Sequence, residues 1–466
     1  MAENHEIELE DDRDSERDVY ALDGGLRAQL KRAVAYRDVR AIDALMEPLH
    51  PADIADLLEQ ISSGEREALL ELWSSGVDGE VLSELEWSTR EEILPLLPDA
   101  VLADAVRELD SDDVVDLVED LGEDQQEAIL DALNDADRAA VEQALSYPEE
   151  SAGRLMQREV VRAPDHWTVG EMIDFLRSDS AELPEQFYHI VLVNPAMKPV
   201  AQVTLGRLLS SPRAVKLVDI TEDSFRVIPV TQDEDDVAYA FNQYHLISAP
   251  VVDDDGRLVG VITIDDAMIV LDEANEEDLL ALSGVGRDES LNDSIATTAR
   301  QRFPWLFVNL LTAIVASLVI SVFEGTISQI VALAVLMPIV ASMGGNAGTQ
   351  SLAVAVRSIA TRDLTRSNML RVVSREAGVG LLNGFAFAII MGFVGFFWFG
   401  LPLLGLVIAV AMVINLVVAA FAGILVPVAL DRFGADPALA SGTFVTTVTD
   451  VVGFFVFLGL ASMLLI

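Results

Sequence analysis

The pattern of apolar residues divides the chain into two parts near residue 300. Beyond that point, long apolar runs occupy residues 303–323, 330–356, 377–399, 403–430 and 442–466. Each run contains the roughly 20 residues that an α-helix needs to cross a ~30 Å hydrocarbon core. We therefore predict that residues 301–466 form an all-α transmembrane bundle of five helices.

Basic residues lie on only one side of these five runs. They occur before the first run, between the second and third, and between the fourth and fifth: Arg300, Arg302, Arg357, Arg362, Arg366, Arg371, Arg375 and Arg432. The opposite connections, residues 324–329 and 400–402, contain none. By the positive-inside rule, the N-terminus is expected in the cytoplasm and the C-terminus outside the cell membrane.

Residues 25–150 show short apolar patterns with the period of an α-helix. The segments IADLLEQI, REALLELW, EVLSEL, EEILPLL, VVDLVEDL and QEAILDAL follow one another every ten to fifteen residues. This spacing predicts an acidic α-helical N domain whose helices stack as a small superhelix. Residues 1–24 lack the basic and apolar regions of a signal peptide and are predicted to form a disordered acidic tail.

Residues 151–264 change to an α/β pattern that occurs twice, in 151–216 and 217–264. The second copy contains IPV, the helical segment DDVAYAFNQYHL, APVVDDD, a turn at Gly256 and LVGVIT. This order resembles a tandem pair of CBS modules. Thr263 and Asp266 follow the last strand and are similar to the nucleotide-binding motif of such modules, so ATP is a possible ligand. Arg207 replaces the corresponding aspartate in the first copy.

Residues 265–300 are predicted to form an acidic connecting helix, or plug helix, before the first span. Its like charges at i and i+4, such as Glu273 and Glu277, destabilise an isolated helix by a few tenths of a kcal/mol. A bound divalent cation would reverse that effect. Asp112 and Asp116 repeat the spacing in the N domain. The alternative is a solvated acidic face.

Charge narrows the classes of partner. The net charge is -46, and residues 286–466 contain nine Arg and nine Asp or Glu, so the excess acidity belongs to residues 1–285. Such acidity argues against nucleic acid and favours cations as partners. It is also typical of proteins adapted to concentrated salt, which need no local metal site to explain it.

Several chemistries are not indicated by the sequence. Cys is absent, which excludes thiolate metal sites and cysteine nucleophiles. The chain contains no G-x-x-x-x-G-K phosphate-binding motif, which argues against a primary pump. The cytoplasmic part shows no set of nucleophile, base and orienting residue, so an enzyme is not expected.

Asp450 is the candidate ion-binding residue of the membrane part. It lies about nine residues into the last span, where a carboxylate costs about 2.5–3.5 kcal/mol on insertion scales. Helical spacing places Thr443, Thr446 and Thr447 on the same face, which predicts an oxygen-lined stripe. The alternative is a structural hydrogen bond from a protonated Asp450.

The second span adds amide and backbone groups to the candidate pathway. Gly344, Gly345 and Gly348 allow another backbone to approach, although a glycine pair of this spacing often serves helix packing alone. Asn346 adds an amide oxygen that could contact a hydrated ion, as does Gln350 one turn later. Asn383 and Asn415, in the third and fourth spans, are predicted to serve packing.

The whole arrangement after about residue 25 resembles the MgtE family of magnesium channels and transporters. The match is carried by LHPADIADLL at Leu49, YPEESAGRLM at Tyr147, MPIVASMGGNAGTQS at Met337 and TTVTDVVGFF at Thr446. The resemblance implies a homodimer with its pore along the subunit interface and hydrated Mg²⁺ held by Asp450. It further implies regulatory Mg²⁺ sites that close the pore, formed by these carboxylates: Asp112, Asp116, Asp266, Glu273, Glu277 and Asp278.

Two departures from the family pattern and three alternatives stay open at this stage. His245 stands where the family can have a carboxylate, and Ala274 interrupts the acidic helix. Oxygen ligands do not separate Mg²⁺ from Mn²⁺ or Co²⁺. A channel and a coupled carrier are both compatible with the sequence. The third alternative is a membrane-anchored CBS sensor that transports nothing, against which Asp450 argues.

Overall fold

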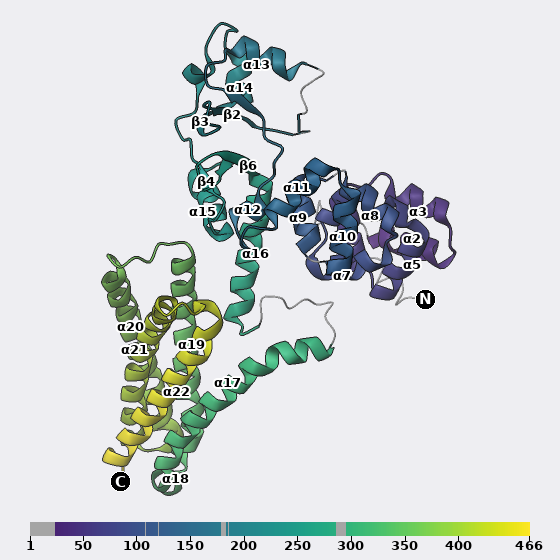
Figure 1. Cartoon of the computed structure of the whole chain (residues 1–466). Helices are drawn as coiled ribbons and strands as arrows, with labels where there is room; N and C mark the ends of the chain where they lie inside the picture. Colours follow the sequence, from purple (N-terminus) through teal and green to yellow (C-terminus); the bar gives the residue numbers. More distant parts are fainter. Residues whose placement is uncertain (1–23, 108, 120, 179–182, 185, 286–294) are drawn as a thin grey trace. The chain divides into compact units, whose positions relative to one another are not determined.

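The computed structural model describes residues 24–107, 109–119, 121–178, 183–184, 186–285 and 295–466 (Figure 1). The chain forms two compact units, Met1–Glu273 and Ala274–Ile466. The predicted tail, residues 1–24, lies outside the described residues except for its last position. The prediction of a multidomain membrane protein with a helical N domain, small CBS-type sheets and a helical bundle is confirmed.

The N domain consists of short helices packed around one apolar core (Figure 1). They are α2 (Gly24–Ala35), α3 (Val39–Met46), α4 (Pro51–Gln60), α5 (Ser63–Trp73), α6 (Gly79–Ser83), α7 (Trp87–Ile93), α8 (Asp99–Val106), α9 (Ser111–Glu119), α10 (Glu123–Ala132) and α11 (Asp135–Ala144). Leucine and isoleucine residues at helical spacing, such as Leu57, Leu69 and Ile93, are fully buried. The apolar period therefore located this core correctly.

Two side-chain devices define the start of α5 and the end of α4. Ser62 and Glu65 form a capping box at the start of α5. Arg66 is only 1% exposed and donates to the carbonyl oxygens of Leu58 and Ile61, at 2.9 and 3.2 Å. These carbonyls lie at the end of α4, where an intrahelical donor is missing. The buried guanidinium of α5 thus provides hydrogen-bond donors for two carbonyl oxygens at the end of α4.

Two three-stranded sheets follow the N domain. The first contains β1 (Arg162–Pro164), β2 (His189–Val193) and β3 (Pro199–Thr204), and the second contains β4 (Ile228–Pro229), β5 (Ser248–Val252) and β6 (Leu258–Thr263). In each, the first strand is parallel to the second and the second antiparallel to the third. Helices α13 (Val169–Leu176), α14 (Leu205–Ser210) and α15 (Glu234–Tyr244) pack on them.

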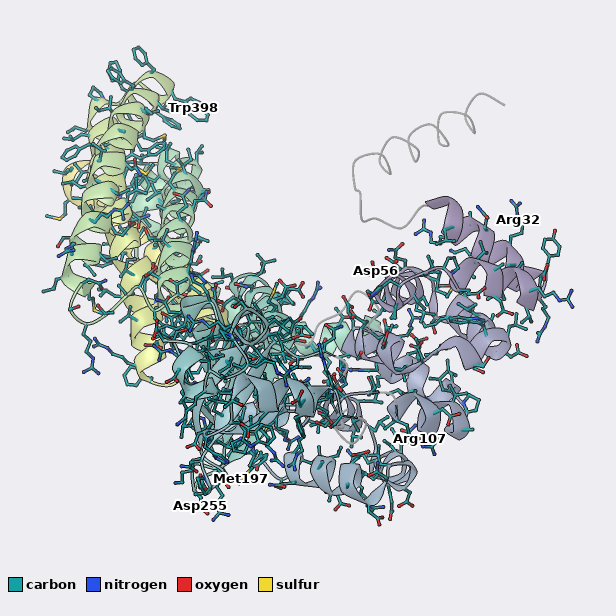
Figure 2. All side chains as sticks on the ribbon, turned by 90° about the horizontal axis from the view of Figure 1, so that it is seen from above. Arg32, Asp56, Arg107, Met197, Asp255 and Trp398 are labelled. Carbon is teal, nitrogen blue, oxygen red and sulfur yellow. The ribbon has the colours of Figure 1, made fainter. Side chains whose placement is uncertain are left out.

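The turns of the two sheets lie at the same end of the pair. Met197 and Asp255 mark them in Figure 2, and the Leu258 amide donates to the Met197 carbonyl at 2.8 Å. Gly256 has a φ of +75°, a conformation that glycine adopts without strain, and this confirms the turn predicted there. The two modules are therefore joined directly by backbone hydrogen bonding.

The segment after the N domain packs on the second module rather than the first. Helix α12 (Ala152–Leu155) donates from the Ala152 and Gly153 amides to the Gln232 and Val230 carbonyls, at 2.7 and 2.9 Å. Arg154 donates to the Tyr147 carbonyl at 3.0 Å and pairs with Glu119 of α9. The YPEESAGRLM motif is thus the joint between the N domain and the second module.

The connecting helix predicted within residues 265–300 corresponds to α16, and α17, the first of five long apolar helices, already begins at Ile295. Helix α16 spans Ile264–Leu282. The apolar helices are α17 (Ile295–Val322), α19 (Ala332–Ala360), α20 (Met369–Phe399), α21 (Pro402–Arg432) and α22 (Pro437–Leu464), with a short α18 (Glu324–Gln329) between the first two. Within the described residues, these five helices are long and apolar enough to span a membrane, which confirms the five predicted spans.

Glycine residues let the membrane helices pack backbone to backbone. A Cβ atom on Gly380 of α20 would lie 2.8 Å from the Leu416 carbonyl oxygen of α21, and one on Gly405 would lie 2.6 Å from the Gly392 carbonyl oxygen. Such contacts are typical of helix pairs in membranes, where small residues replace the hydrophobic driving force. Helix α17, in contrast, packs mainly along α22 and leaves most of its apolar side chains exposed (Figure 1).

Candidate cation sites

Asp450 lies in the middle of α22 and is partly exposed in the single chain. Thr446 and Thr447 lie about one turn before it on the same helix. The hydroxyl of Thr446 donates to the Gly442 carbonyl at 2.9 Å, and that of Thr447 donates to the Thr443 carbonyl at 2.6 Å. Because each hydroxyl proton is used within the helix, the oxygen lone pairs remain available as acceptors. The stripe presents oxygen atoms to an ion or to its water shell.

The glycine and asparagine motif of α19 divides between two faces of an unbroken helix. Gly344 and Gly348 face the bundle, and a Cβ atom on Gly348 would lie 2.6 Å from Cγ1 of Val445 on α22. A Cβ atom on Gly345 would meet no atom of another helix within 4 Å among the described residues, and Asn346 is exposed. The close approach predicted for these glycines therefore occurs at Gly344 and Gly348, whereas Gly345 and Asn346 face away from the chain's own helices.

Asn415 is the first residue whose importance the sequence did not indicate. Its side chain is fully buried in α21, and Nδ2 donates to the Val340 carbonyl of α19 at 2.9 Å. Its Oδ1 has no hydrogen-bond partner among the described residues. A buried acceptor left unpaired costs about 1–3 kcal/mol. The signal was an amide in an apolar span, but nothing in the sequence tells which contacts that amide makes.

Glu376 is the second residue that the sequence reasoning did not identify. It was placed in the arginine-rich loop, because the apolar run begins at residue 377. Helix α20 instead begins at Met369, and Glu376 accepts a hydrogen bond of 3.0 Å from Ser351 of α19. Ser351 is 7% exposed. A second carboxylate therefore reaches the side of the bundle.

A group of carboxylates gathers where the N domain meets the second module. We name it the carboxylate seam: Asp110, Asp112 and Asp113 at the start of α9, and Asp265 and Asp266 at the start of α16. Burial raises the pKa of Asp112 well above its usual value, and the charge of Asp266 adds to this effect. Burial and the charge of Asp266 also raise the pKa of Asp113 to about 7. The seam thus brings the predicted residues Asp112 and Asp266 together.

Asp266 has both a structural partner and an electrostatic conflict. The Thr263 hydroxyl donates to its carboxylate at 2.5 Å, which caps the start of α16. Burial, together with neighbouring carboxylates, nevertheless raises the pKa of Asp266 to about 6. Desolvation and repulsion therefore outweigh the stabilising hydrogen bond.

The remaining predicted regulatory residues lie elsewhere. Asp116 pairs with Arg90 of α7 at 2.5 Å, and its side chain is 59% exposed. Glu273 lies near Glu234 of α15, whose pKa is raised to about 7 by burial and by the charges of Glu150 and Glu273. Glu277 and Asp278 follow on α16 and are partly buried. Among the described residues, no three Asp, Glu or His side chains already converge as metal ligands.

The raised pKa values give a pH dependence that can be measured without a cation. Asp113 and Asp266 are protonated in the folded chain at pH 5 and become charged as the pH passes 6 to 7, so the packing at the seam is destabilised as the pH rises. One pKa unit corresponds to about 1.4 kcal/mol. With divalent cations removed, hydrogen exchange in α9 and the first turn of α16, corrected for intrinsic rates, should be about tenfold or more faster at pH 8 than at pH 5.

Helix α13, remote from the seam, provides the internal control for this experiment, because its capping carboxylate Glu171 has a lowered pKa and stays ionised over this range. Equal protection of α9 at both pH values would contradict the assigned repulsion. Added Mg²⁺ should restore the protection at pH 8, where the carboxylates are ionised, and have little effect at pH 5.

The last turn of α16 packs on the ends of two of the long apolar helices, α19 and α22. Ala281 is 2% exposed and belongs to a cluster with Leu352 and Val356 of α19 and Val445 of α22. A Cβ atom on Gly442, at the start of α22, would lie 3.9 Å from the Leu282 carbonyl oxygen. Helix α16 therefore begins with a seam carboxylate and ends against the helix that carries Asp450.

A cleft lies between the two CBS-type modules. Its lining includes Gln157, Glu159, Tyr188, His189, Ser248 and Thr263. His189 is 7% exposed, and its ring links Ser248 of the second module, at 2.6 Å, with Glu222, at 3.2 Å. Burial lowers the pKa of His189, which favours the neutral ring. Thr263 thus lines the cleft, while Asp266, its partner, belongs to the seam.

Comparison with known proteins adds independent information. The sequence profile described as MgtE, divalent cation transporter, matches residues 337–460. The profile of the MgtE intracellular N domain matches residues 49–150, and that of the CBS domain matches residues 218–273. The two profiles specific to MgtE thus cover both the N domain and the membrane helices that contain Asn346 and Asp450.

Individual relatives are similar over nearly their whole length. The magnesium transporter MgtE of Thermus thermophilus is 32% identical over 446 residues, which cover 94% of this chain and 98% of that protein. That of Bacillus subtilis is 29% identical over 435 residues, covering 93% and 96%. The crystal structure of the cytosolic domain of the Mg²⁺ channel MgtE in complex with ATP is 30% identical, with a TM-score of 0.47, and covers 52% of this chain and 99% of that one.

Proposed function

The chain belongs to the MgtE family of magnesium transporters, and from this premise we propose that it is a magnesium-selective channel closed by cytoplasmic Mg²⁺. It is a membrane-spanning transporter with a cytoplasmic N domain, and its family is not a class of enzymes. The proposal goes further in three respects: the ion pathway, the closing signal and the assembly. The observation that carries it is the continuous helix α16, which extends from Asp266 to the packing contacts of Ala281 with α22.

We propose that Asp450 binds the transported ion through its water shell. Mg²⁺ is dehydrated reluctantly and usually keeps several waters, so a carboxylate flanked by threonine oxygen atoms suits it better than a closed protein cage. Asn346 and the backbone of Gly345 lie on the outer face of α19, where a second subunit would complete the pathway. This supports a homodimer whose pore runs along the interface, with Asp450, Asn346, Gly345, Thr446 and Thr447 contributed by each subunit. Gly344, which was also predicted for the pore, instead packs against Asn415 inside the bundle.

We propose that the carboxylate seam is the sensor for cytoplasmic Mg²⁺. In the absence of a cation, its charges oppose the packing of α9 on the start of α16. A divalent cation stabilises the packed state through its greater affinity for that state. Asp112 and Asp266 are the proposed primary ligands. We propose further Mg²⁺ sites that use Asp116, Glu273, Glu277 and Asp278. Asp116 can bind an ion only after its ion pair with Arg90 opens.

The remaining parts of the proposal concern topology and nucleotide. We propose that the C-terminus lies outside the cell membrane, since an odd number of spans begins in the cytoplasm. The cleft lined by Thr263 and His189 is the proposed site for ATP, which one related cytosolic domain binds. ATP would act there as a regulator, since the transport proposal requires no hydrolysis.

Flux measurements in proteoliposomes test the proposed function directly. The purified chain, in concentrated potassium chloride, should move Mg²⁺ down its gradient, and the flux should fall as Mg²⁺ is raised on the cytoplasmic side. If the flux of Mn²⁺ or Co²⁺ equals or exceeds that of Mg²⁺, the chain is not selective for Mg²⁺ and the proposed ion is wrong. Transport only with a coupled ion gradient would indicate a carrier. A folded chain that moves none of these cations would support the CBS sensor instead.

A further inference from the structure

We infer that Asn415 is a positioning residue for the proposed pore. Its amide fixes the rotation of α22 against α19 and α21, and thereby the place of Asp450. This inference rests on the proposed function, because it concerns the carboxylate that the proposal assigns to the ion. Three contacts of one side chain support it.

The first contact is the hydrogen bond to α19. Nδ2 of Asn415 lies 2.9 Å from the Val340 carbonyl oxygen, in a side chain that is 0% exposed. A carbonyl oxygen can only accept, so the amide nitrogen must face α19 and the orientation of the amide is determined. The Oδ1 atom then has no partner among the described residues.

The other two contacts are with glycine residues of two different helices. A Cβ atom on Gly453 of α22 would lie 2.8 Å from Nδ2, and one on Gly344 of α19 would lie closer still to the same atom. Neither distance is possible between nonbonded atoms, so Asn415 occupies a socket that exists only because both residues lack a side chain. Three helices therefore meet at one amide group.

The socket restricts how α22 can rotate. Successive residues of an α-helix are about 100° apart, so rotation by one residue would bring Val452 or Phe454 toward Asn415 in place of Gly453. Neither side chain fits the space that the amide fills. Asp450 lies one turn before Gly453, and Asn346 lies two residues after Gly344. The socket is thus within one turn of both proposed pore residues.

Stability alone does not account for an amide at this position. A buried polar group with one unpaired atom contributes less to stability than a well-packed apolar group of similar shape. A single buried asparagine can instead specify register between helices, as in coiled coils, where it lowers stability. Asparagine side chains within membrane spans commonly form hydrogen bonds between helices. We therefore assign to Asn415 a part in the alignment of α22, alongside the apolar contact of Val445 with Gly348.

Two substitutions separate alignment from space filling. Asn415→Leu retains the branched shape without the donor, and Asn415→Ala also removes the volume. Asn383→Leu is the matched control, because Asn383 is exposed on α20. For each variant, the unfolding temperature in detergent, the Mg²⁺ flux per folded protein, the half-saturating Mg²⁺ concentration and the ratio of Mg²⁺ to Mn²⁺ flux are measured.

We expect both Asn415 variants to lose at least tenfold in flux and to shift the half-saturating concentration by threefold or more, while Asn415→Leu unfolds near the native temperature. Native flux and half-saturation in Asn415→Leu would show that only volume matters and would overturn the inference. Flux lost only in proportion to folded protein would also overturn it. If Asn415→Leu does not fold, Asn415→Ala decides by the same criteria.

The pore proposal is tested separately in the same preparations. If Asp450→Asn abolishes flux and the folded Asn415 variants conduct as the native chain does, the positioning role alone is wrong. If Asp450→Asn conducts normally, the proposed pore is wrong, and the role of Asn415 is overturned with it.

Discussion

Replacing Asp450 with Asn should lower the Mg²⁺ flux by a factor of at least ten to one hundred without unfolding the chain. The substitution keeps the size of the side chain and removes only its charge. Hydrogen bonds to a charged group contribute about 1.5–3 kcal/mol, and each 1.4 kcal/mol is a factor of ten in an equilibrium constant. The loss should be larger in a homodimer, where two carboxylates face the same hydrated ion. The measurement is Mg²⁺ uptake into proteoliposomes at equal amounts of folded protein.

Glu324→Gln provides the matched control, because Glu324 is an exposed carboxylate at the start of the short helix α18, outside the five long apolar helices. It loses the same charge and should keep native flux. Thr446→Val, which removes one oxygen atom of the stripe, should give a smaller loss than Asp450→Asn, since a neutral oxygen interacts more weakly with a cation than a carboxylate. Native flux in Asp450→Asn would show that this carboxylate has a structural role.

The sequence predicted most of the fold because its strongest signals are local. Spans of about 20 apolar residues have few alternatives to a transmembrane helix. The helices are longer than the apolar runs, since α20 begins at Met369 rather than residue 377 and includes Arg371 and Arg375. Hydropathy marks the part of a helix within hydrocarbon, whereas the backbone continues through the interface. Glu376 was missed for this reason.

The sequence predicted the candidate ion sites only where a single residue is unusual in its own segment. Asp450 stands out as a carboxylate in an apolar helix, but contacts between distant segments carry no local signal. The ion pair of Asp116 with Arg90 and the socket around Asn415 each depend on how helices pack. The burial of Asp112 likewise follows from tertiary structure, and it changes an apparently solvated acidic face into a strained one. Carboxylates at i and i+4 have the same spacing whether their helix face is exposed to solvent or buried against another domain, so the spacing alone cannot distinguish the two.

The second large effect is expected at the carboxylate seam. In the double variant Asp112→Asn with Asp266→Asn, the change in flux produced by cytoplasmic Mg²⁺ should be at least about tenfold smaller than in the native chain. The flux without cytoplasmic Mg²⁺ should also fall below native, because the neutral seam packs without a cation. Both amides preserve shape, and the amide oxygen introduced at position 266 can still accept from the Thr263 hydroxyl at the start of α16. Removing two charges abolishes the repulsion that a cation relieves, so Mg²⁺ loses its preference for the packed state. The measurement is flux as a function of Mg²⁺ on the cytoplasmic side.

A second double variant separates this effect from a general loss of charge. Asp43→Asn with Asp56→Asn removes two exposed carboxylates of α3 and α4, of which Asp56 is labelled in Figure 2. It changes the net charge equally, but it should leave the inhibition curve unchanged, since exposed charges in concentrated salt are screened within a few Å. Equal shifts in both variants would mean that Mg²⁺ acts through the diffuse acidity of the whole cytoplasmic part. A shift confined to the seam variant would identify Asp112 and Asp266 as the origin of closure, because these two carboxylates repel each other where α9 approaches the first turn of α16.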